Sequence, residues 1–441
     1  MARQDGSEAF FPDKGAAPGV AETLNAIGDG KMTAQQAVAA CHDRALQLDP
    51  SLAAFTIVND APFRPDPSLV LDGIAVGVKD LYDTVGLPTT YGSAIYRGNR
   101  PQQDAWLVGR LKELGAFVAG KTVTTEFAWR QAGPTVNPFN RSHTPGGSSS
   151  GSAASVAAGI VPLALGTQTF GSIIRPAAFC GVVGFKPSHG ELPLTGVHPL
   201  SPTLDHAGYF ARSVGDVRLI HALVLKRNQP AIRAEKVRLR VVRSPFWGQA
   251  GPRQQAALDD ATALLAKAGF SITSHELPAP FDGALALAET VLCHEAAALY
   301  RPLVDRYPDL VSGHIREMVV RGESLPASTY DQAIEQAHGL RHAFAREMEN
   351  YDAVLTLPAL GEAPLLSEGT GNAGPCVLWT LLGVPSIALP WGFGAHGLPL
   401  GIQLAGTAGN DFRLLDIGAE IERQFRMHHH PARGAATVRP A

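Results

Sequence analysis

The chain has 441 residues, of which 45% are hydrophobic and 17% charged, a composition that suits a large folded core and excludes a disordered protein. Its formal net charge is −3 and it holds no block of lysines and arginines, which argues against nucleic acid as a direct ligand. The four cysteines form no CxxC pair, so neither a disulfide framework nor a zinc ribbon is expected, and a reducing compartment fits.

The first predicted elements are a helix and a strand. Thr33 and Gln36 have the spacing of a capping box, and the apolar residues that follow them fall on one helical face. Further on, Ile74, Val76 and Val78 alternate and lead directly into Lys79 and Asp80. This pattern predicts a strand that ends in two charged side chains.

Helices and strands then alternate along the chain. Helices are predicted over 106–114 and 253–269 and near 411–422, with a mainly helical stretch over 281–351. Strands are predicted over 116–120 and 236–242 and near 351–358, 384–390 and 397–406. Because strands at both ends flank a helical stretch, we expect one α/β domain with a single large sheet. Within it we predict a core over about 65–215, a helical variable insertion over about 216–350 and C-terminal strands and a helix over about 351–425.

The stretch "GGSSSGS" over 146–152 allows several interpretations. A flexible linker is disfavoured because the stretch is short and runs into an Ala-rich helix former. A phosphate-binding loop needs a lysine where Ser152 stands. The segment also matches GxSxG around Ser149, but a nucleophile elbow follows a buried strand, and the preceding "NPFNRSHTP" is polar with two prolines.

A second serine-bearing turn lies 24 residues beyond Ser148, in "GTQTFGSIIRP", where Ser172 precedes a helix that Pro176 can begin. A serine hydroxyl is a poor nucleophile until a base takes its proton. Lys79 can be that base if burial keeps it neutral, and a second serine can relay the proton. Spacing alone does not show that these groups meet.

Metal sites are not expected. His294 and Glu295 begin like HExxH, but Ala298 occupies the place of the second histidine, and the histidines at 428–430 lie in a Pro-rich tail. We therefore predict no metal and no organic cofactor.

From Gln36 to Arg423 the chain resembles the amidase signature family. The resemblance is carried by several blocks in the family's order: "GIAVGVKDLYDT", "TPGGSSSGSAASVAAG", "ALGTQTFGSIIRPAAFCGVVGFKPSHG", "SPTLDHAGYFARSV", "LLGVPSIALPWG" and "GLPLGIQLAG". It implies a central mixed sheet flanked by helices on both faces and a Ser–cisSer–Lys hydrolase. The positions that match are Ser172 as nucleophile, Ser148 as relay after a cis peptide bond, and Lys79 as base.

The resemblance also implies an oxyanion hole of backbone N–H groups over Thr169, Phe170, Gly171 and Ser172. The family usually reads "GTDTGGSIRIP" here, whereas this chain has Gln168 for Asp, Phe170 for Gly and its arginine one place later, at Arg175. For Gln168 we expect a hydrogen bond that replaces the support of the Asp.

Three outcomes are open for Phe170, since its bulk can narrow the acyl pocket, turn into the core or impair catalysis. Trp129 and Trp379 are further candidates for the pocket, with the core as the alternative for each. Asp205 and Lys186 match family positions and are expected to hold the core.

These inferences predict an amidase that hydrolyses the C–N bond of a small non-peptide carboxamide through an acyl-Ser172 intermediate. The alternatives are the amidase-like subunit of a tRNA-dependent amidotransferase, which releases ammonia from glutamine within a complex, and a catalytically silent homologue. Residues 1–15 lack a signal-peptide pattern and no apolar run reaches 18 residues, so we expect a cytoplasmic protein without membrane contact. A homodimer is the oligomeric state to test.

Overall fold

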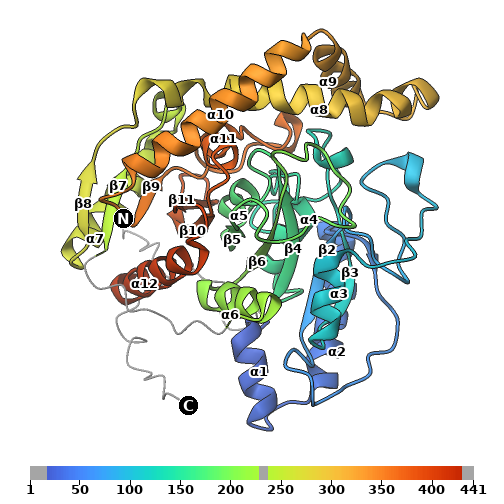
Figure 1. Ribbon diagram of the computed structural model, residues 1–441. Coiled ribbons are helices and arrows are strands. Elements are labelled where there is room, and N and C mark those ends of the chain that lie inside the picture. The colour runs from blue at the N-terminus through green and yellow to red at the C-terminus, as the bar shows by residue number, and fades with distance from the viewer. Residues whose placement is uncertain (1–16, 228–236, 430–441) are drawn as a thin grey trace.

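The structure is a computed structural model that describes residues 17–227 and 237–429 (Figure 1). Residues 1–15, where no signal peptide was predicted, and His430 of the histidine run lie outside these ranges. No helix within 17–227 and 237–429 combines the length and apolar character that a bilayer crossing requires.

One sheet of 11 strands forms the centre of the molecule. In chain order its strands are β1 (Phe55–Val58), β2 (Ala75–Lys79), β3 (Phe117–Thr122), β4 (Leu163–Gln168), β5 (Val183–Lys186), β6 (His206–Ala211), β7 (Arg238–Val241), β8 (Ser271–Ser274), β9 (Ala353–Thr356), β10 (Ser386–Phe393) and β11 (Pro399–Ala405). Their order across the sheet is β1-β3-β2-β4-β6-β5-β10-β11-β9-β7-β8.

The sheet is mixed, with parallel pairs at β3-β2-β4 and β9-β7-β8 and antiparallel pairs between the remaining neighbours. The predicted α/β fold with one large sheet is therefore confirmed.

Helices flank this sheet along the chain. The described residues form α1 (Val20–Gly28), α2 (Ala34–Leu52), α3 (Trp106–Glu113), α4 (Ser150–Ala157), α5 (Ile174–Phe179), α6 (Val214–Leu225), α7 (Pro252–Lys267), α8 (Ala284–Arg306), α9 (Gly313–Glu323), α10 (Ala327–Glu347), α11 (Gly374–Leu381) and α12 (Asp411–His429). The capping box predicted before α2 is present, since Thr33 Oγ1 accepts from Gln36 N and Gln36 Oε1 accepts from Thr33 N.

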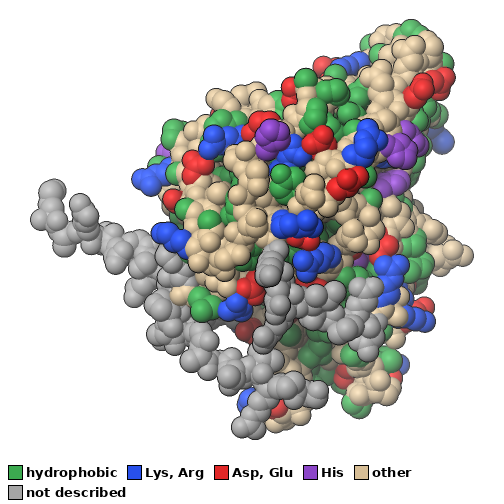
Figure 2. Space-filling model, turned by 60° about the vertical axis from the view of Figure 1, so that its left-hand side comes forward, with side chains coloured by type: hydrophobic (Ala, Val, Ile, Leu, Met, Phe, Trp, Pro, Cys, Tyr) green, Lys and Arg blue, Asp and Glu red, His purple; other side chains and the backbone are tan. Residues whose placement is uncertain are grey.

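The predicted helical insertion over 216–350 is partly wrong, because β7 and β8 lie within it and pair into the sheet edge. The stretch without strands is narrower and comprises α8, α9 and α10, which run along the top of the molecule in Figure 1. On the face shown in Figure 2, basic and acidic side chains are interspersed.

Alternation along β2 decides which way its last residue faces. Val76 and Val78 join the core cluster that holds residues of α3, α6 and α12, whereas Ala75 joins the cluster with residues of α4 and α5. Successive side chains of a strand point to opposite faces, so Lys79 shares the face of Ala75. The end of β2 therefore points a lysine toward the loop that precedes α4.

Candidate active site

Lys79 is fully buried at the end of β2. Its Nζ lies 2.8 Å from Ser148 Oγ and 2.7 Å from Thr167 Oγ1. Burial lowers the pKa of Lys79 well below its usual 10.5, and the negative charge of Asp205 raises it by a smaller amount. A lysine in this setting can hold a neutral amine, which is the form that accepts a proton.

The Gly/Ser loop places its three consecutive serines differently. The peptide bond between Gly147 and Ser148 is cis. Ser148 lines a cavity, whereas Ser149 is fully buried and its Oγ donates to the carbonyl of Thr167. Ser150 begins α4 and donates to the carbonyl of Val123. Ser149, the serine of the formal GxSxG match, is therefore not accessible from the cavity. Ser148 is the serine that contacts Lys79 and lines the cavity.

The turn after β4 brings Ser172 to the same cavity, whose volume is about 820 Å³. Within the described chain, Ser172 Oγ has no hydrogen-bond partner, and the N–H groups of Phe170, Gly171 and Ser172 donate to no backbone carbonyl. Hydrogen bonds between catalytic groups are often long without substrate and tighten when it binds. The turn thus offers a hydroxyl and a row of N–H donors at one place.

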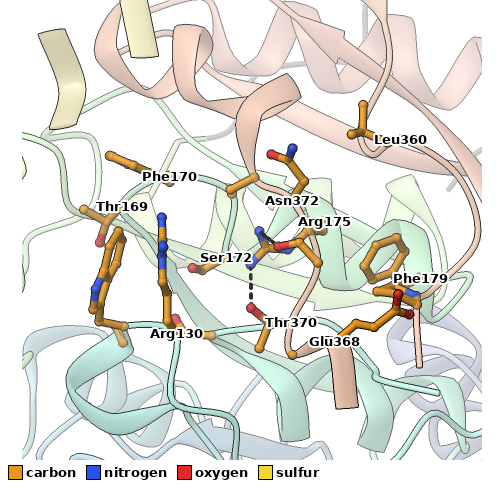
Figure 3. Close-up of a pocket in the computed structure, with 18 of the residues that line it drawn as sticks. Arg130, Thr169, Phe170, Ser172, Arg175, Phe179, Leu360, Glu368, Thr370 and Asn372 are labelled. Carbon is orange, nitrogen blue, oxygen red and sulfur yellow. Dashed lines mark hydrogen bonds between the residues drawn. The ribbon is translucent and has the colours of Figure 1, made fainter. Parts of the chain in front are cut away.

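Three stretches that are distant in the sequence form most of the cavity wall (Figure 3). They are 128–130, 169–175 and 360–373, with Ser148, Phe179 and His314 completing it. Sequence reasoning missed Arg130 and the whole of 360–373. The one available signal for the latter was the Gly- and Asn-rich run "SEGTGNAG" between a predicted strand and the block "LLGVPSIALPWG".

The comparisons with known proteins decide the family. The family model Amidase matches residues 34–415. The chain belongs to the amidase family. Its relatives include the A subunit of glutamyl-tRNA(Gln) amidotransferase from Thermus thermophilus, 31% identical over 91% of this chain and 96% of the relative. The protein of the same name from Rhodopirellula baltica is 33% identical over 92% and 96% of the two chains.

Solved structures of related proteins share this fold. A crystal structure described as an amidase superposes with a TM-score of 0.84 at 28% identity, covering 92% of this chain and all of that one. The native peptide amidase from Stenotrophomonas maltophilia gives 0.78 at 26% identity over 92% and 97%. The A subunit of glutamyl-tRNA(Gln) amidotransferase from Thermotoga maritima gives 0.81 at 25% identity, with 96% of each chain covered.

In this member of the amidase family Gln168 supports the turn that carries Ser172. Its side-chain oxygen accepts from the backbone N–H groups of Ile173 and Ile174 at 2.9 and 3.0 Å, and its Nε2 donates to Thr380 Oγ1. Thr380 Oγ1 in turn donates to the carbonyl of Phe170. The first N–H groups of a helix have no partner within it, so Gln168 caps α5 from outside.

Gln168→Ala is expected to lower the free energy of unfolding by about 2 kcal/mol or more, because two buried N–H groups lose their acceptor. Amide turnover should fall as the turn loosens. Urea denaturation and kcat measure the two effects. Unchanged stability and turnover in Gln168→Ala would show that these hydrogen bonds do not support the turn that carries Ser172.

Arg175 joins the two serine loops to the 360–373 stretch. It donates to the carbonyl of Gly147, to the carbonyl of Gly371 at 2.9 Å and to Thr370 Oγ1 at 3.4 Å, the last drawn in Figure 3. Burial, with a smaller effect of the nearby Arg130 charge, lowers the pKa of Arg175 to about 10. Its displacement by one residue from the family pattern still leaves a cation at the peptide bond before Ser148.

Asp205 holds the opposite side of the turn. One carboxylate oxygen accepts from Thr169 Oγ1 at 2.6 Å, and the other accepts from the N–H groups of Leu200 and Ser201. Burial raises the pKa of Asp205 to about 6 although these hydrogen bonds favour the charged form. This carboxylate therefore fixes the start of the 169–172 turn through its hydrogen bond with Thr169.

Phe170 both packs in the core and lines the cavity, which combines two of the outcomes left open by the sequence. The residue is 6% exposed, and its ring meets the Trp129 ring edge-on at a centroid distance of 5.7 Å. Its φ lies outside the left-handed region, so its backbone has no need of a glycine.

Trp129 lines the cavity too, but Trp379 does not, because it is 1% exposed and packs on Phe344. The prediction of Trp379 in the pocket is wrong.

Phe170→Gly is expected to cost about 3–5 kcal/mol of unfolding free energy, the usual loss for a buried aromatic ring. Removing the ring also widens the cavity beside Ser172, so bulky amides should gain in kcat/KM relative to short ones. Thermal denaturation and a kinetic series from acetamide to benzamide test this. An unchanged ratio between short and bulky amides would mean that Phe170 does not shape the pocket.

Proposed function

We propose that the protein hydrolyses the C–N bond of a small carboxamide through an acyl-Ser172 intermediate. The observation that carries this proposal is the contact of the buried Lys79 Nζ with Ser148 Oγ at 2.8 Å, beside a cavity that Ser148 and Ser172 both line. A lysine, a relay serine and a second serine are the groups that acyl transfer by a Ser–Ser–Lys route needs.

In the proposed reaction a proton is relayed from Ser172 to Lys79 and is later returned to the leaving amine. Ser172 Oγ attacks the amide carbonyl while its proton passes to Ser148 and the proton of Ser148 passes to neutral Lys79. The oxyanion is held by N–H groups of the 169–172 turn, where one such donor contributes about 2.7–4 kcal/mol. As the C–N bond breaks, the proton returns through Ser148 to the leaving amine, and water then hydrolyses the Ser172 ester by the same relay.

The decisive experiment is an assay of ammonia or amine release over a panel of aliphatic and aryl amides, with Lys79→Ala as the blank. Release by the wild type and none by the blank supports the proposal. A blank that matches the wild type would rule out the proposed base. Turnover that depends on Ser172 would also dispose of the interpretation as a catalytically silent homologue.

A second candidate is the glutamine-hydrolysing subunit of a tRNA-dependent amidotransferase. The observation that favours it is the name shared by relatives at 31% and 33% identity, which are A subunits of glutamyl-tRNA(Gln) amidotransferase. These names support the second candidate more directly than a free-standing amidase, while the geometry serves both, because glutamine is itself a carboxamide.

A glutaminase assay combined with size-exclusion chromatography separates the two candidates. A free-standing amidase turns over simple amides as a monomer or homodimer and has no glutaminase activity. An amidotransferase subunit hydrolyses glutamine and co-purifies with partner chains when isolated from its own cells. Light scattering on the same column measures whether the purified chain is a homodimer.

A further inference from the structure

Arg130 is a cation in the wall of the cavity that holds Ser172. Its residue is exposed, and its guanidinium carbon lies 4.8 Å from the centre of the Trp129 ring. Within the described chain Arg130 forms no ion pair, unlike the arginines paired elsewhere on the surface. A guanidinium stacked on an aromatic ring is held in orientation while the donors along its edge stay free for a ligand.

The chain before Arg130 holds it in an unusual conformation. Phe127, Ala128 and Arg130 have φ values of 47°, 63° and 38°, in the left-handed region that residues with a side chain rarely adopt. Such residues persist where the surroundings over-determine them, and they cluster at ligand sites. Here Phe127 is fully buried, and the neighbouring Glu126 accepts from Ser312 N and Ser93 Oγ. The turn therefore presents Arg130 from a fixed base.

Charge is unevenly distributed in the cavity. In Figure 3, Arg130 and Glu368 lie on opposite sides of Ser172. Glu362 accepts from the N–H groups of His396 and Leu398, and Glu368 accepts from the N–H of Leu365, so both carboxylates already have hydrogen-bond donors within the chain. Arg130 also lies close enough to Arg175 for its charge to act on that guanidinium. Arg175 donates to backbone carbonyls, so Arg130 is the arginine of the cavity wall whose donors are not used by the described chain.

We propose that Arg130 is a specificity-determining residue, and that it selects carboxamides that carry a carboxylate, which it pairs while Ser172 attacks the amide. This inference rests on the proposed function. A planar guanidinium matches a carboxylate with two parallel hydrogen bonds. The two glutamates in the wall disfavour a larger, doubly charged group such as a phosphate, so a single carboxylate is the anion that fits.

The first test compares amides of equal length with and without a carboxylate: succinamate with butyramide, and glutaramate with valeramide. The wild type is expected to favour the acid of each pair at least about tenfold in kcat/KM, the effect of one charge-assisted hydrogen bond. Arg130→Gln should remove this preference through a higher KM for the acids. Arg130→Lys should retain part of it.

Arg97→Gln, which removes an exposed arginine outside the cavity, is the matched control and should change neither member of a pair. Equal kcat/KM for acid and neutral amide in the wild type would overturn the inference. So would an Arg130→Gln variant that affects both members of each pair alike.

A binding test works without turnover. On Ser172→Ala, titration calorimetry should give succinamate a Kd at least about tenfold below that of butyramide, and adding Arg130→Gln should abolish the difference. Rising salt should weaken succinamate alone. If the wild type hydrolyses no amide but this difference is found, the proposed function fails and the carboxylate site stands. Inorganic phosphate that competes as well as succinate would overturn the assignment to carboxylates.

Discussion

Ser172→Ala is expected to abolish amide hydrolysis with the fold intact. Ser172 lines the cavity and its Oγ has no hydrogen-bond partner within the described chain, so its loss leaves no buried polar group unpaired. Removal of the nucleophile of a serine hydrolase lowers kcat by about a millionfold. Ammonia release measures the loss, and the melting temperature should stay within a few degrees of the wild type.

Ser367→Ala is the matched control, because Ser367 lines the same cavity and is exposed. It should retain full activity. Trapping the acyl group on the peptide that contains Ser172, followed by mass spectrometry, identifies the nucleophile directly. An acyl group found on Ser148 instead, or substantial activity in Ser172→Ala, would reassign the roles of the two serines.

Lys79→Met is expected to lower kcat by about 10²–10⁴-fold, the usual contribution of a general base. Methionine fills a similar volume, so the buried space between β2 and the Gly/Ser loop stays packed. Lys79→Ala leaves room for a small amine, and added propylamine should restore part of its activity. The same amine should not rescue Lys79→Met, and rescue of both variants would contradict a base at this position.

The wild-type pH profile reports on the same lysine. Lys79 must be neutral to accept a proton, so kcat/KM should fall as pH decreases through its pKa. Because burial lowers that pKa, the midpoint of the fall should lie well below pH 10.5. Activity that instead continued to rise up to that pH would mean that Lys79 stays charged at neutral pH.

Periodicity was enough to place Lys79. Alternation over 74–78 predicted a strand that ends in a lysine, and β2 ends at Lys79. Ser149 is buried and donates to the carbonyl of Thr167, whereas the role of Ser172 as nucleophile stays a prediction. The strand was predicted correctly because alternation is a local pattern of neighbouring residues.

Contacts between distant stretches could not be predicted. Arg130 and Thr370 line one cavity although 240 positions separate them, and no local pattern encodes that meeting. Trp379 was predicted as a pocket candidate but lies in the core. A tryptophan near a family block is equally compatible with either place. Its burial is decided by Phe344 on α10, which packs against it from another part of the chain.

The order of strands divides the molecule in a way that bears on how it is assembled. Strands β1 to β6 form one side of the sheet and β7 to β11 the other, and the two sides join along β5 and β10 alone. Lys79 and both serines belong to the first length of chain, whereas 360–373 belongs to the second. Helix α5, which starts two residues after Ser172, packs on strands from both. The cavity wall is thus built from both lengths of chain, and it is complete only when the two are folded against each other.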